Sequence, residues 1–234
     1  MSGSGDDILD FIVDTSMESA KTWRFFHEPL TIGHGRAWLL QHVLRNRFYS
    51  AVMRPAWVSR CPDLTLVRKT IGQMREELVY DDEIKTAHTT LLWQFGRNLG
   101  LKDEQMDTVT PEPLCGIFFN TLENMARTRH WLVGWLGSSL AEFVSFAVGD
   151  TLSADNWKKS LGLSEEEVFF FRYHEHADLE HAGRKTWEPM RKFVTDKSVR
   201  DEIVEGLPIL LAAHYCYYEG VARLGDKFDR EASR

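Results

Sequence analysis

Apolar residues recur at three- and four-residue intervals along nearly the whole chain, and no segment alternates apolar with polar residues for long enough to predict a strand. The pattern therefore predicts an all-α protein. The predicted helices cover residues 8–26, 37–53, 64–99, 110–129, 130–148, 165–193 and 209–224. The acidic stretch Asp81-Asp82-Glu83 lies in the middle of the third helix, where we expect a bend or a partly unwound turn.

Glycine and proline residues mark the expected breaks between helices. The Gly33-His34-Gly35 segment predicts a turn after the first helix. Gly162 predicts a helix C-cap, and Ser164 with Glu167 forms a capping box that predicts the start of the next helix. Gly206-Leu207-Pro208 predicts that the last helix begins just after the proline.

Length and composition limit the class of protein. A chain of 234 residues with 43% hydrophobic residues is long enough and apolar enough for a single domain over 1–234, with flexible ends at 1–7 and 226–234. The net charge is −7, so there is no basic excess to neutralise phosphates. We therefore expect no nucleic-acid partner.

The cysteines, the N-terminus and the apolar segments indicate the cellular compartment of the protein. Cys61, Cys115 and Cys216 stand far apart without a CxxC pair, which argues against a disulfide scaffold and a thiolate zinc site. The N-terminus lacks the pattern of a secretory signal, and small and polar residues interrupt the longest apolar run, residues 131–148. These features predict a cytoplasmic protein without a membrane span.

The segment around His174 carries the most specific chemistry. On a helix, His174, Asp178 and His181 fall within about 60° of one another, so two imidazoles and a carboxylate share one stripe. A single histidine on a helix is usually a packed or surface residue. Three metal-binding side chains at these offsets are rarer, and they indicate a metal site.

A second candidate ligand is Glu142, which lies in a strongly apolar helix. A buried unpaired carboxylate costs several kcal/mol, so this residue should be protonated, paired or bound to a cation. Coordination to a metal fits this setting best. The alternative is a salt bridge to Arg127 or Arg45.

The acidic segment before His88 supplies a third set of candidates. In a continuous helix Asp81 and His88 would lie about 10 Å apart along the axis, which is too far for one ion. They would instead flank two ions, and Glu77 would approach His88 if the segment unwinds. Three carboxylates and three imidazoles make a mixed oxygen and nitrogen set suited to two iron or manganese ions.

These residues carry a resemblance to a known family. The order Glu77, His88, Glu142 and then His174-x3-Asp178-x2-His181 resembles the heme-oxygenase-like di-iron oxidases. That family has a seven-helix bundle, and it shares its scaffold with thiaminase-II-like and pyrroloquinoline-quinone-synthase-like proteins. The resemblance covers most of the chain.

The resemblance implies a ligand set and an activity. The implied metal ligands, which are also the catalytic set, are Glu77, His88, Glu142, His174, Asp178 and His181. Here the gap before the histidine is longer than the family's, which leaves Glu76 and Asp81 as alternatives to Glu77. The implied cofactors are two Fe(II) ions, with O2 as co-substrate. Family members N-oxygenate, desaturate or cleave small molecules, and we expect a homodimer that uses an external electron donor.

Basic and aromatic residues of the second predicted helix bear on the substrate. Arg45, Arg47 and Arg54 lie on an apolar helix, where one guanidinium would hold a substrate carboxylate, so an amino acid or amino-acid-derived natural-product intermediate is the expected substrate. Arg47, Phe48 and Tyr49 are the predicted substrate-binding residues. The alternatives are a fatty acid as substrate, a thiaminase-II-like hydrolase with Cys115 or Cys216 as nucleophile, and a non-catalytic helical interaction protein.

Overall fold

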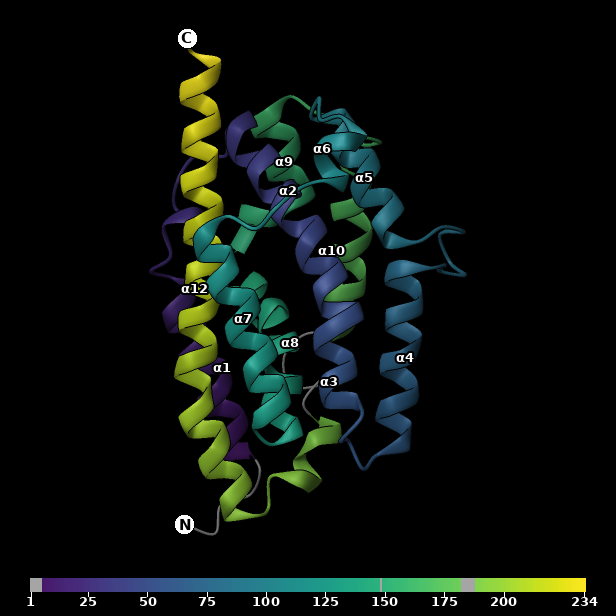
Figure 1. Ribbon diagram of the computed structural model, residues 1–234, viewed down its shortest axis with the longest axis vertical. Coiled ribbons are helices and arrows are strands. Elements are labelled where there is room, and N and C mark those ends of the chain that lie inside the picture. The colour runs from purple at the N-terminus through teal and green to yellow at the C-terminus, as the bar shows by residue number, and fades with distance from the viewer. Residues whose placement is uncertain (1–5, 148, 182–187) are drawn as a thin grey trace.

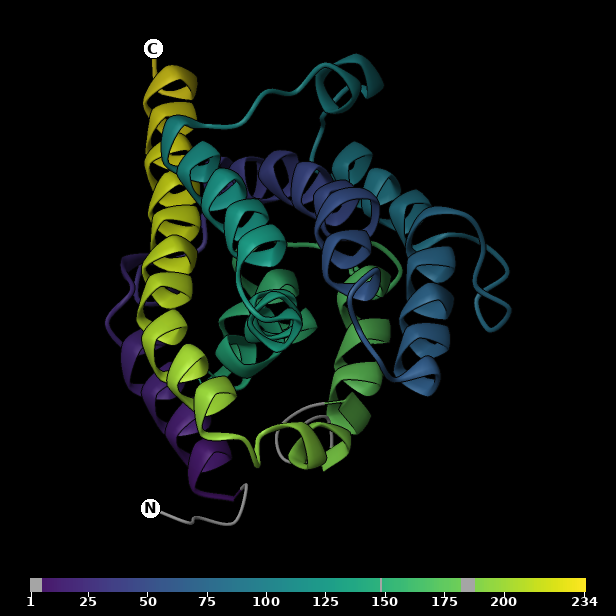
Figure 2. The ribbon, with the colours of Figure 1, turned by 60° about the horizontal axis from the view of Figure 1, so that its bottom comes forward.

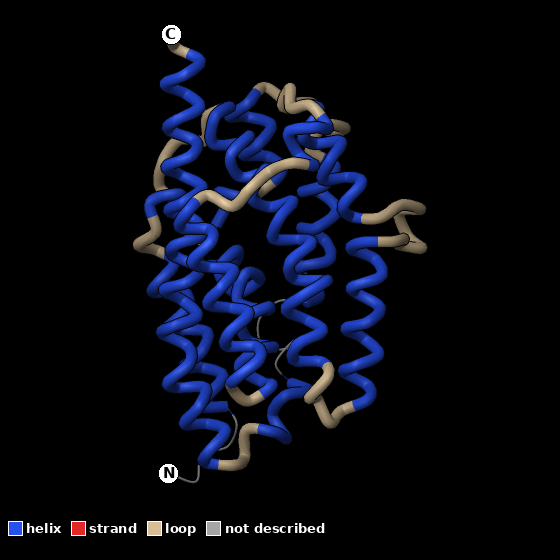
Figure 3. The backbone as a smooth tube through the Cα atoms, in the orientation of Figure 1, coloured by secondary structure: helices blue, strands red, loops and turns tan. Residues whose placement is uncertain are grey.

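The computed structural model describes residues 6–147, 149–181 and 188–234. Within these ranges it leaves out the side chains of residues 6, 142, 143, 145–147, 149, 150, 176–181 and 188. The described part is helical apart from turns and loops, with one isolated β-bridge between Asp81 and Thr86 (Figure 3). The predicted all-α class is confirmed.

The α-helices are α1 (Asp6–Ala20), α2 (Ile32–Phe48), α3 (Arg54–Val58), α4 (Leu64–Leu78), α5 (His88–Asn98), α6 (Asp103–Asp107), α7 (Pro113–Thr128), α8 (Trp131–Ala147), α9 (Ala154–Leu161), α10 (Phe169–His181) and α12 (Lys197–Ala232). A π-helical stretch, Tyr49–Met53, joins α2 to α3. Short 3-10 helices cover Arg24–Phe26, Gly149–Leu152 and Glu188–Phe193.

The long helix α12 organises the bundle. It runs along one side of the molecule and packs against α2 and α7 (Figure 1). Helix α8 lies inside, in contact with α1, α3, α7 and α12 (Figure 2), and residues 131–140 on it are all buried. Trp23, Trp57 and Trp157 are almost fully buried in the core, where each large side chain contributes roughly 1.5–3 kcal/mol.

The predicted helix over 64–99 is divided into α4 and α5 by residues 79–87, which project from the edge of the bundle (Figure 1). The Asp81 carboxylate accepts the backbone N–H of Glu83, and the backbone N–H of Asp81 bonds to the Thr86 carbonyl. Lys85 has a φ of 59°, which closes the turn. This loop brings the end of α4 next to the start of α5.

Helix α2 begins earlier than predicted. The Thr31 side chain caps it by accepting the backbone N–H of His34, so the Gly33-His34-Gly35 segment is helical and the predicted turn there is wrong. A Cβ atom on Gly33 would lie 2.7 Å from the carbonyl oxygen of Gly225 in α12. The close contact of α2 with α12 therefore requires glycine at position 33. The sequence pattern does not distinguish a glycine needed for helix packing from a glycine in a turn, and for this reason it predicts a turn here.

Helix α12 continues through Pro208, so the predicted start at residue 209 is wrong. A proline in a helix interior costs about 3 kcal/mol. Leu207, Leu210 and Leu211 around it are buried in the core, and this packing on both sides of the proline holds the helix together. The helix also continues to Ala232, into the segment 226–234 for which the sequence predicts a flexible end.

Two other predicted helices are shorter than expected. Helix α1 ends at Ala20, and the rest of the predicted segment includes the 3-10 turn at Arg24–Phe26. Gly162 ends α9 with a φ of 69°, as predicted, and the hydrogen bonds of the Ser164–Glu167 capping box are present. Regular α-helix begins only at Phe169. Over the described residues, no helix is long and apolar enough to cross a membrane.

Candidate metal centre

His88, the first residue of α5, is held by the loop that precedes it. Its Nε2 lies 2.8 Å from Asp81 Oδ2, and the same oxygen accepts a hydrogen bond from the Tyr173 hydroxyl of α10 at 2.9 Å. Asp81 is 5% exposed, and the donors around it outweigh its burial and lower its pKa. An ionised carboxylate only accepts hydrogen bonds, so His88 Nε2 carries a proton, and in the neutral ring Nδ1 presents a lone pair.

The Nδ1 atom of His88 faces Glu77 at the end of α4. It is buried and has no hydrogen-bond partner among the described residues, and it lies 3.7 Å from Glu77 Oε2. The Asn46 amide of α2 donates to that same carboxylate oxygen. The Thr89 hydroxyl donates to the backbone carbonyl of Glu77 at 2.5 Å and so joins the two helix ends.

His174 of α10 completes the described part of the cluster. Its ring centroid lies 5.0 Å from that of His88, with the ring planes 80° apart. Its Nδ1 lies 2.7 Å from the carbonyl oxygen of Phe170. A carbonyl only accepts, so Nδ1 carries the proton and Nε2 is the free ligand atom.

The charges around this cluster favour an ionised Glu77. Burial by itself would raise the pKa of Glu77, but the neighbouring His88 and the positive charge of Arg54 outweigh it and lower the pKa to about 2. Burial likewise opposes protonation of His88, whereas Glu77 and Asp81 raise its pKa. By contrast, burial raises the pKa of Glu76, which makes no described ion pair with His88.

The other three predicted ligands lie partly outside the described residues. Glu142 belongs to α8, and Asp178 and His181 belong to α10, but their side chains are not described. Of the two arginines weighed as partners for Glu142, Arg127 pairs with Glu123 at 2.8 Å. The structure thus brings together Glu77, His88 and His174, and the rest of the set stays a prediction.

The predicted substrate-binding residues separate in space. Arg47 is exposed, Phe48 is half-buried against Phe119, and Tyr49 is buried with its hydroxyl 3.4 Å from His214 Nε2. The structure does not bring Arg47 to the buried residues.

Arg45, one helical turn before Tyr49, is the buried arginine of α2. Its guanidinium lies 5.0 Å from the ring centroid of Tyr217 and 5.8 Å from that of Tyr49. Among the described residues its hydrogen-bond partner is the Tyr218 hydroxyl, at 3.4 Å, and it has no carboxylate within ion-pair distance.

Sequence reasoning missed four polar residues around the cluster: His42, Asn46, Thr89 and Tyr173. His42 stacks on Trp38 with centroids 4.2 Å apart, and burial, with the charges of Arg45 and His174, lowers its pKa well below the ordinary value. The spacing in α2 could have indicated two of them, because His42 and Asn46 are four residues apart and so lie on one face of the helix.

The comparisons with known proteins agree with this geometry. A family model described as iron-containing redox enzymes matches residues 36–215, which is well over half of the chain and includes all six predicted ligands. The chain belongs to the family of iron-containing redox enzymes. Membership indicates an iron-binding oxidoreductase, and histidine with carboxylate is a donor set that iron accepts.

The fold of this iron-containing redox enzyme is shared with a solved structure. The crystal structure of a domain of unknown function with a heme oxygenase-like fold, from Shewanella denitrificans OS217, is similar with a TM-score of 0.73. The match covers 94% of this chain and 93% of that chain at 18% identity, so it shows the fold alone. The predicted heme-oxygenase-like resemblance is confirmed. No curated protein matches the sequence.

Proposed function

We propose that this protein is a non-heme di-iron oxygenase or oxidase that uses O2 to oxidise an amino acid or an amino-acid-derived molecule in natural-product biosynthesis. The proposed ligands are Glu77, His88, Glu142, His174, Asp178 and His181. The observation that carries the proposal is the buried, unpartnered Nδ1 of His88, which faces the ionised Glu77 beside His174.

The separation of these atoms suits a shared ion. A hydrogen bond from His88 Nδ1 to Glu77 would require about 2.7–3.2 Å, and 3.7 Å is too long. Two ligand atoms that each bind one ion at about 2.0–2.2 Å are separated by roughly 3–4 Å, depending on the angle at the metal. The gap between the two side chains therefore fits a metal ion better than a proton.

The surrounding residues hold the ligands in place. When bound, ferrous iron would supply the electrons that reduce O2 and the open positions that admit it. Asp81 keeps the proton of His88 on Nε2, and Asn46 orients the Glu77 carboxylate. Burial and the Asp81 carboxylate raise the pKa of Tyr173, so its hydroxyl stays protonated as a donor to Asp81. Asp81 thus acts as a positioning residue rather than a ligand.

Anaerobic ferrous titration followed by stopped-flow mixing with O2 tests the proposal. The wild-type protein should bind two irons and give a transient visible band, and the His174→Ala variant should lose the band. Glu77→Gln should lose iron, whereas Glu76→Gln, its matched neighbour, should behave as wild type. Absence of stoichiometric iron binding would overturn the di-iron proposal, and loss of iron in Glu76→Gln alone would reassign the first carboxylate.

Arg45 supports an anionic substrate. Among the described residues the buried Arg45 guanidinium has no carboxylate partner, which costs several kcal/mol, and the faces of Tyr49 and Tyr217 offset part of this cost through cation–π contacts. A substrate carboxylate would pair with it as a bidentate fork. We therefore assign to Arg45 the substrate-binding role that was predicted for Arg47.

Paired ligands test this assignment. Amino acids should speed the decay of the O2-dependent band, and the amines that lack the carboxylate should not. Arg45→Gln should abolish this discrimination, whereas the exposed Arg47→Gln should retain it. Acceleration by a fatty acid but by no amino acid would overturn the assigned substrate class.

The thiaminase-like alternative is less favourable. Such a hydrolase needs a reactive thiolate, but Cys115 is fully buried and its thiol donates to the Tyr217 carbonyl at 3.4 Å. Burial and the nearby Glu112 raise its pKa, so the thiol stays protonated. Burial also raises the pKa of Cys216. A homodimer and an external electron donor stay predictions.

A further inference from the structure

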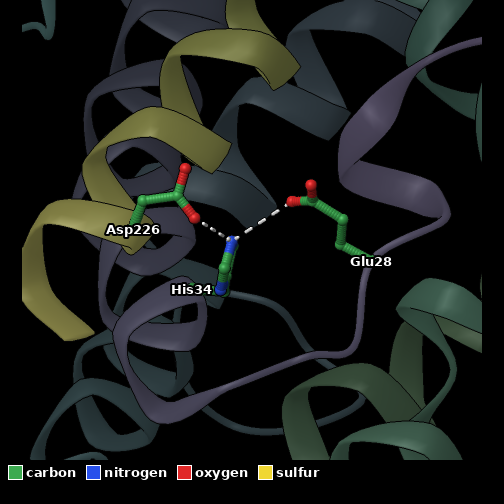
Figure 4. A group of neighbouring side chains, drawn as sticks. All are labelled: Glu28, His34 and Asp226. Carbon is green, nitrogen blue, oxygen red and sulfur yellow. Dashed lines mark ion pairs between the residues drawn. The ribbon is translucent and has the colours of Figure 1, made fainter. Parts of the chain in front are cut away.

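A second cluster of candidate ligands lies far from the first in sequence, where the start of α2 meets the last turns of α12. It consists of Glu28, His34 and Asp226 (Figure 4). One potential ligand atom from each residue lies within 4.8 Å of the other two. All three residues lie outside residues 36–215, the part that matches the family model. The cluster therefore does not belong to the iron site proposed above.

Hydrogen bonds fix which nitrogen of His34 carries the proton. The Thr31 hydroxyl donates its only hydrogen to Asp229 at 2.5 Å, and it accepts the backbone N–H of His34 at 3.1 Å. Its oxygen also lies 2.7 Å from His34 Nδ1. Because the hydroxyl hydrogen is already used, Nδ1 must be the donor in this contact. In the neutral ring Nε2 then presents a lone pair.

That lone pair points between two carboxylates (Figure 4). The distances from His34 Nε2 are 3.5 Å to Asp226 Oδ1 and 3.7 Å to Glu28 Oε2, both too long for hydrogen bonds. The atom is buried, with the His34 side chain 8% exposed, and it has no hydrogen-bond partner among the described residues. Three electron-rich atoms thus face one another across a gap.

The charge balance of the cluster favours a cation in that gap. The cluster and the residues that form ion pairs with it or with Arg24 comprise four carboxylates and two guanidinium groups: Glu28, Glu219, Asp226 and Asp229 against Arg24 and Arg223. Two negative charges are left over. Arg24 contacts Asp226 through Oδ2 at 2.9 Å and both oxygens of Glu28 at 3.2 Å, so Asp226 Oδ1 faces His34 without a contact to Arg24.

The backbone is shaped to bring these residues together. A Cβ atom on Gly33 would lie 2.3 Å from Asp229 Oδ1, and one on Gly225 would lie 2.8 Å from the Cα atom of His34. Only glycine at both positions lets the helices approach so closely. Glu28 also borders a cavity of about 390 Å³ beside α9.

We propose that Glu28, His34 and Asp226 bind one divalent transition-metal ion, and that this ion ties the end of α12 to the start of α2. One imidazole and two carboxylates, with a fourth position left for water, form a set that Zn²⁺ accepts with tetrahedral geometry. Ligand atoms on a tetrahedral zinc are roughly 3.3–3.5 Å apart, close to the two distances from His34. The site does not depend on the function proposed for the iron centre.

Zinc binding is best measured in a protein whose iron site has been removed. The His88→Ala/His174→Ala double variant, dialysed against Zn²⁺ and analysed for metal, should retain about one ion per chain. Adding His34→Ala should remove that ion, and adding the exposed His27→Ala should not. Co²⁺ in the same background should give the visible bands of a tetrahedral site. If the double variant retains no ion, or retains it after His34→Ala, the proposal is overturned.

Three further variants separate binding from folding. Asp226→Asn keeps the shape of the side chain and should weaken Zn²⁺ binding at least tenfold with an unchanged circular dichroism spectrum. Thr31→Ser keeps the hydroxyl and should bind Zn²⁺ as wild type, whereas Thr31→Val should bind 10–100-fold more weakly, because it no longer fixes the His34 tautomer. If all three variants bind Zn²⁺ with the affinity of the wild type, His34 and the carboxylates form only an ion pair and the proposal is overturned.

Discussion

Asp81 offers the sharpest test of the reasoning about His88. Its carboxylate accepts three hydrogen bonds: from His88 Nε2 at 2.8 Å, from the Tyr173 hydroxyl at 2.9 Å and from the backbone N–H of Glu83 at 2.7 Å. Asp81→Asn keeps the size of the side chain but turns one acceptor oxygen into an NH2 donor. With the amide oxygen toward His88, the NH2 group would face the Glu83 N–H, and one donor would lose its partner.

The opposite orientation of the introduced amide would place the NH2 group against His88 Nε2 and move the histidine proton to Nδ1, the proposed ligand atom. Either arrangement weakens the site. A buried donor without a partner costs about 1–3 kcal/mol of folding stability. Loss of a hydrogen bond that orients a metal-binding histidine typically lowers metal affinity 10–100-fold, or about 1.4–2.7 kcal/mol.

Urea denaturation of the iron-free protein and anaerobic Fe(II) titration measure the two effects. Asp81→Asn should unfold more easily and bind two irons more weakly. The control is Asp82→Asn, because Asp82 is exposed and pairs with Arg75 on the surface, and it should change stability by less than about 0.5 kcal/mol. A fall to one iron per chain at saturation would make Asp81 a ligand, and unchanged stability and affinity would refute its role in positioning His88.

Three other predictions concern the rest of the molecule. Gly225→Ala places a Cβ atom 2.8 Å from the His34 backbone and should lower the free energy of unfolding, measured with urea, by about 1–3 kcal/mol. Gly72→Ala is the control, because a Cβ atom there has nothing within 4 Å, and it should raise the free energy of unfolding by about 0.5–1 kcal/mol. Equal effects of the two substitutions would contradict the packing argument. Burial lowers the pKa of His214 to about 4, so as the pH falls the unfolded chain binds a proton at this histidine before the folded chain does. The free energy of unfolding should therefore decrease by up to about 3 kcal/mol as the pH falls from about 6.5 to 4. His214→Gln should reduce this loss, and an equal loss in the variant would show that other groups cause it. Cys115→Ala should leave iron binding and the O2 reaction unchanged, and loss of an activity on thiamin-like substrates would instead favour the hydrolase.

The sequence by itself determined the features that arise from local interactions. Helix periodicity depends on residues three and four apart, so the all-α class could be predicted directly. The end of α9 at Gly162 is equally local, because a left-handed residue there needs glycine. The spacing of His174, Asp178 and His181 also lies within one helix, and it was the most specific part of the family resemblance.

Tertiary structure decided what depends on contacts between distant segments. The sequence favoured Glu77 but left Glu76 and Asp81 as alternatives, and only the fold of α4 and its following loop places Glu77 and Asp81 beside different nitrogens of His88. Thr31 and Asp229, 198 residues apart, meet because α2 and α12 approach closely at Gly33 and Gly225, of which the sequence pattern presents Gly33 as part of a turn. A local rule assigns such glycines to loops because it contains no information about the helix that packs against them.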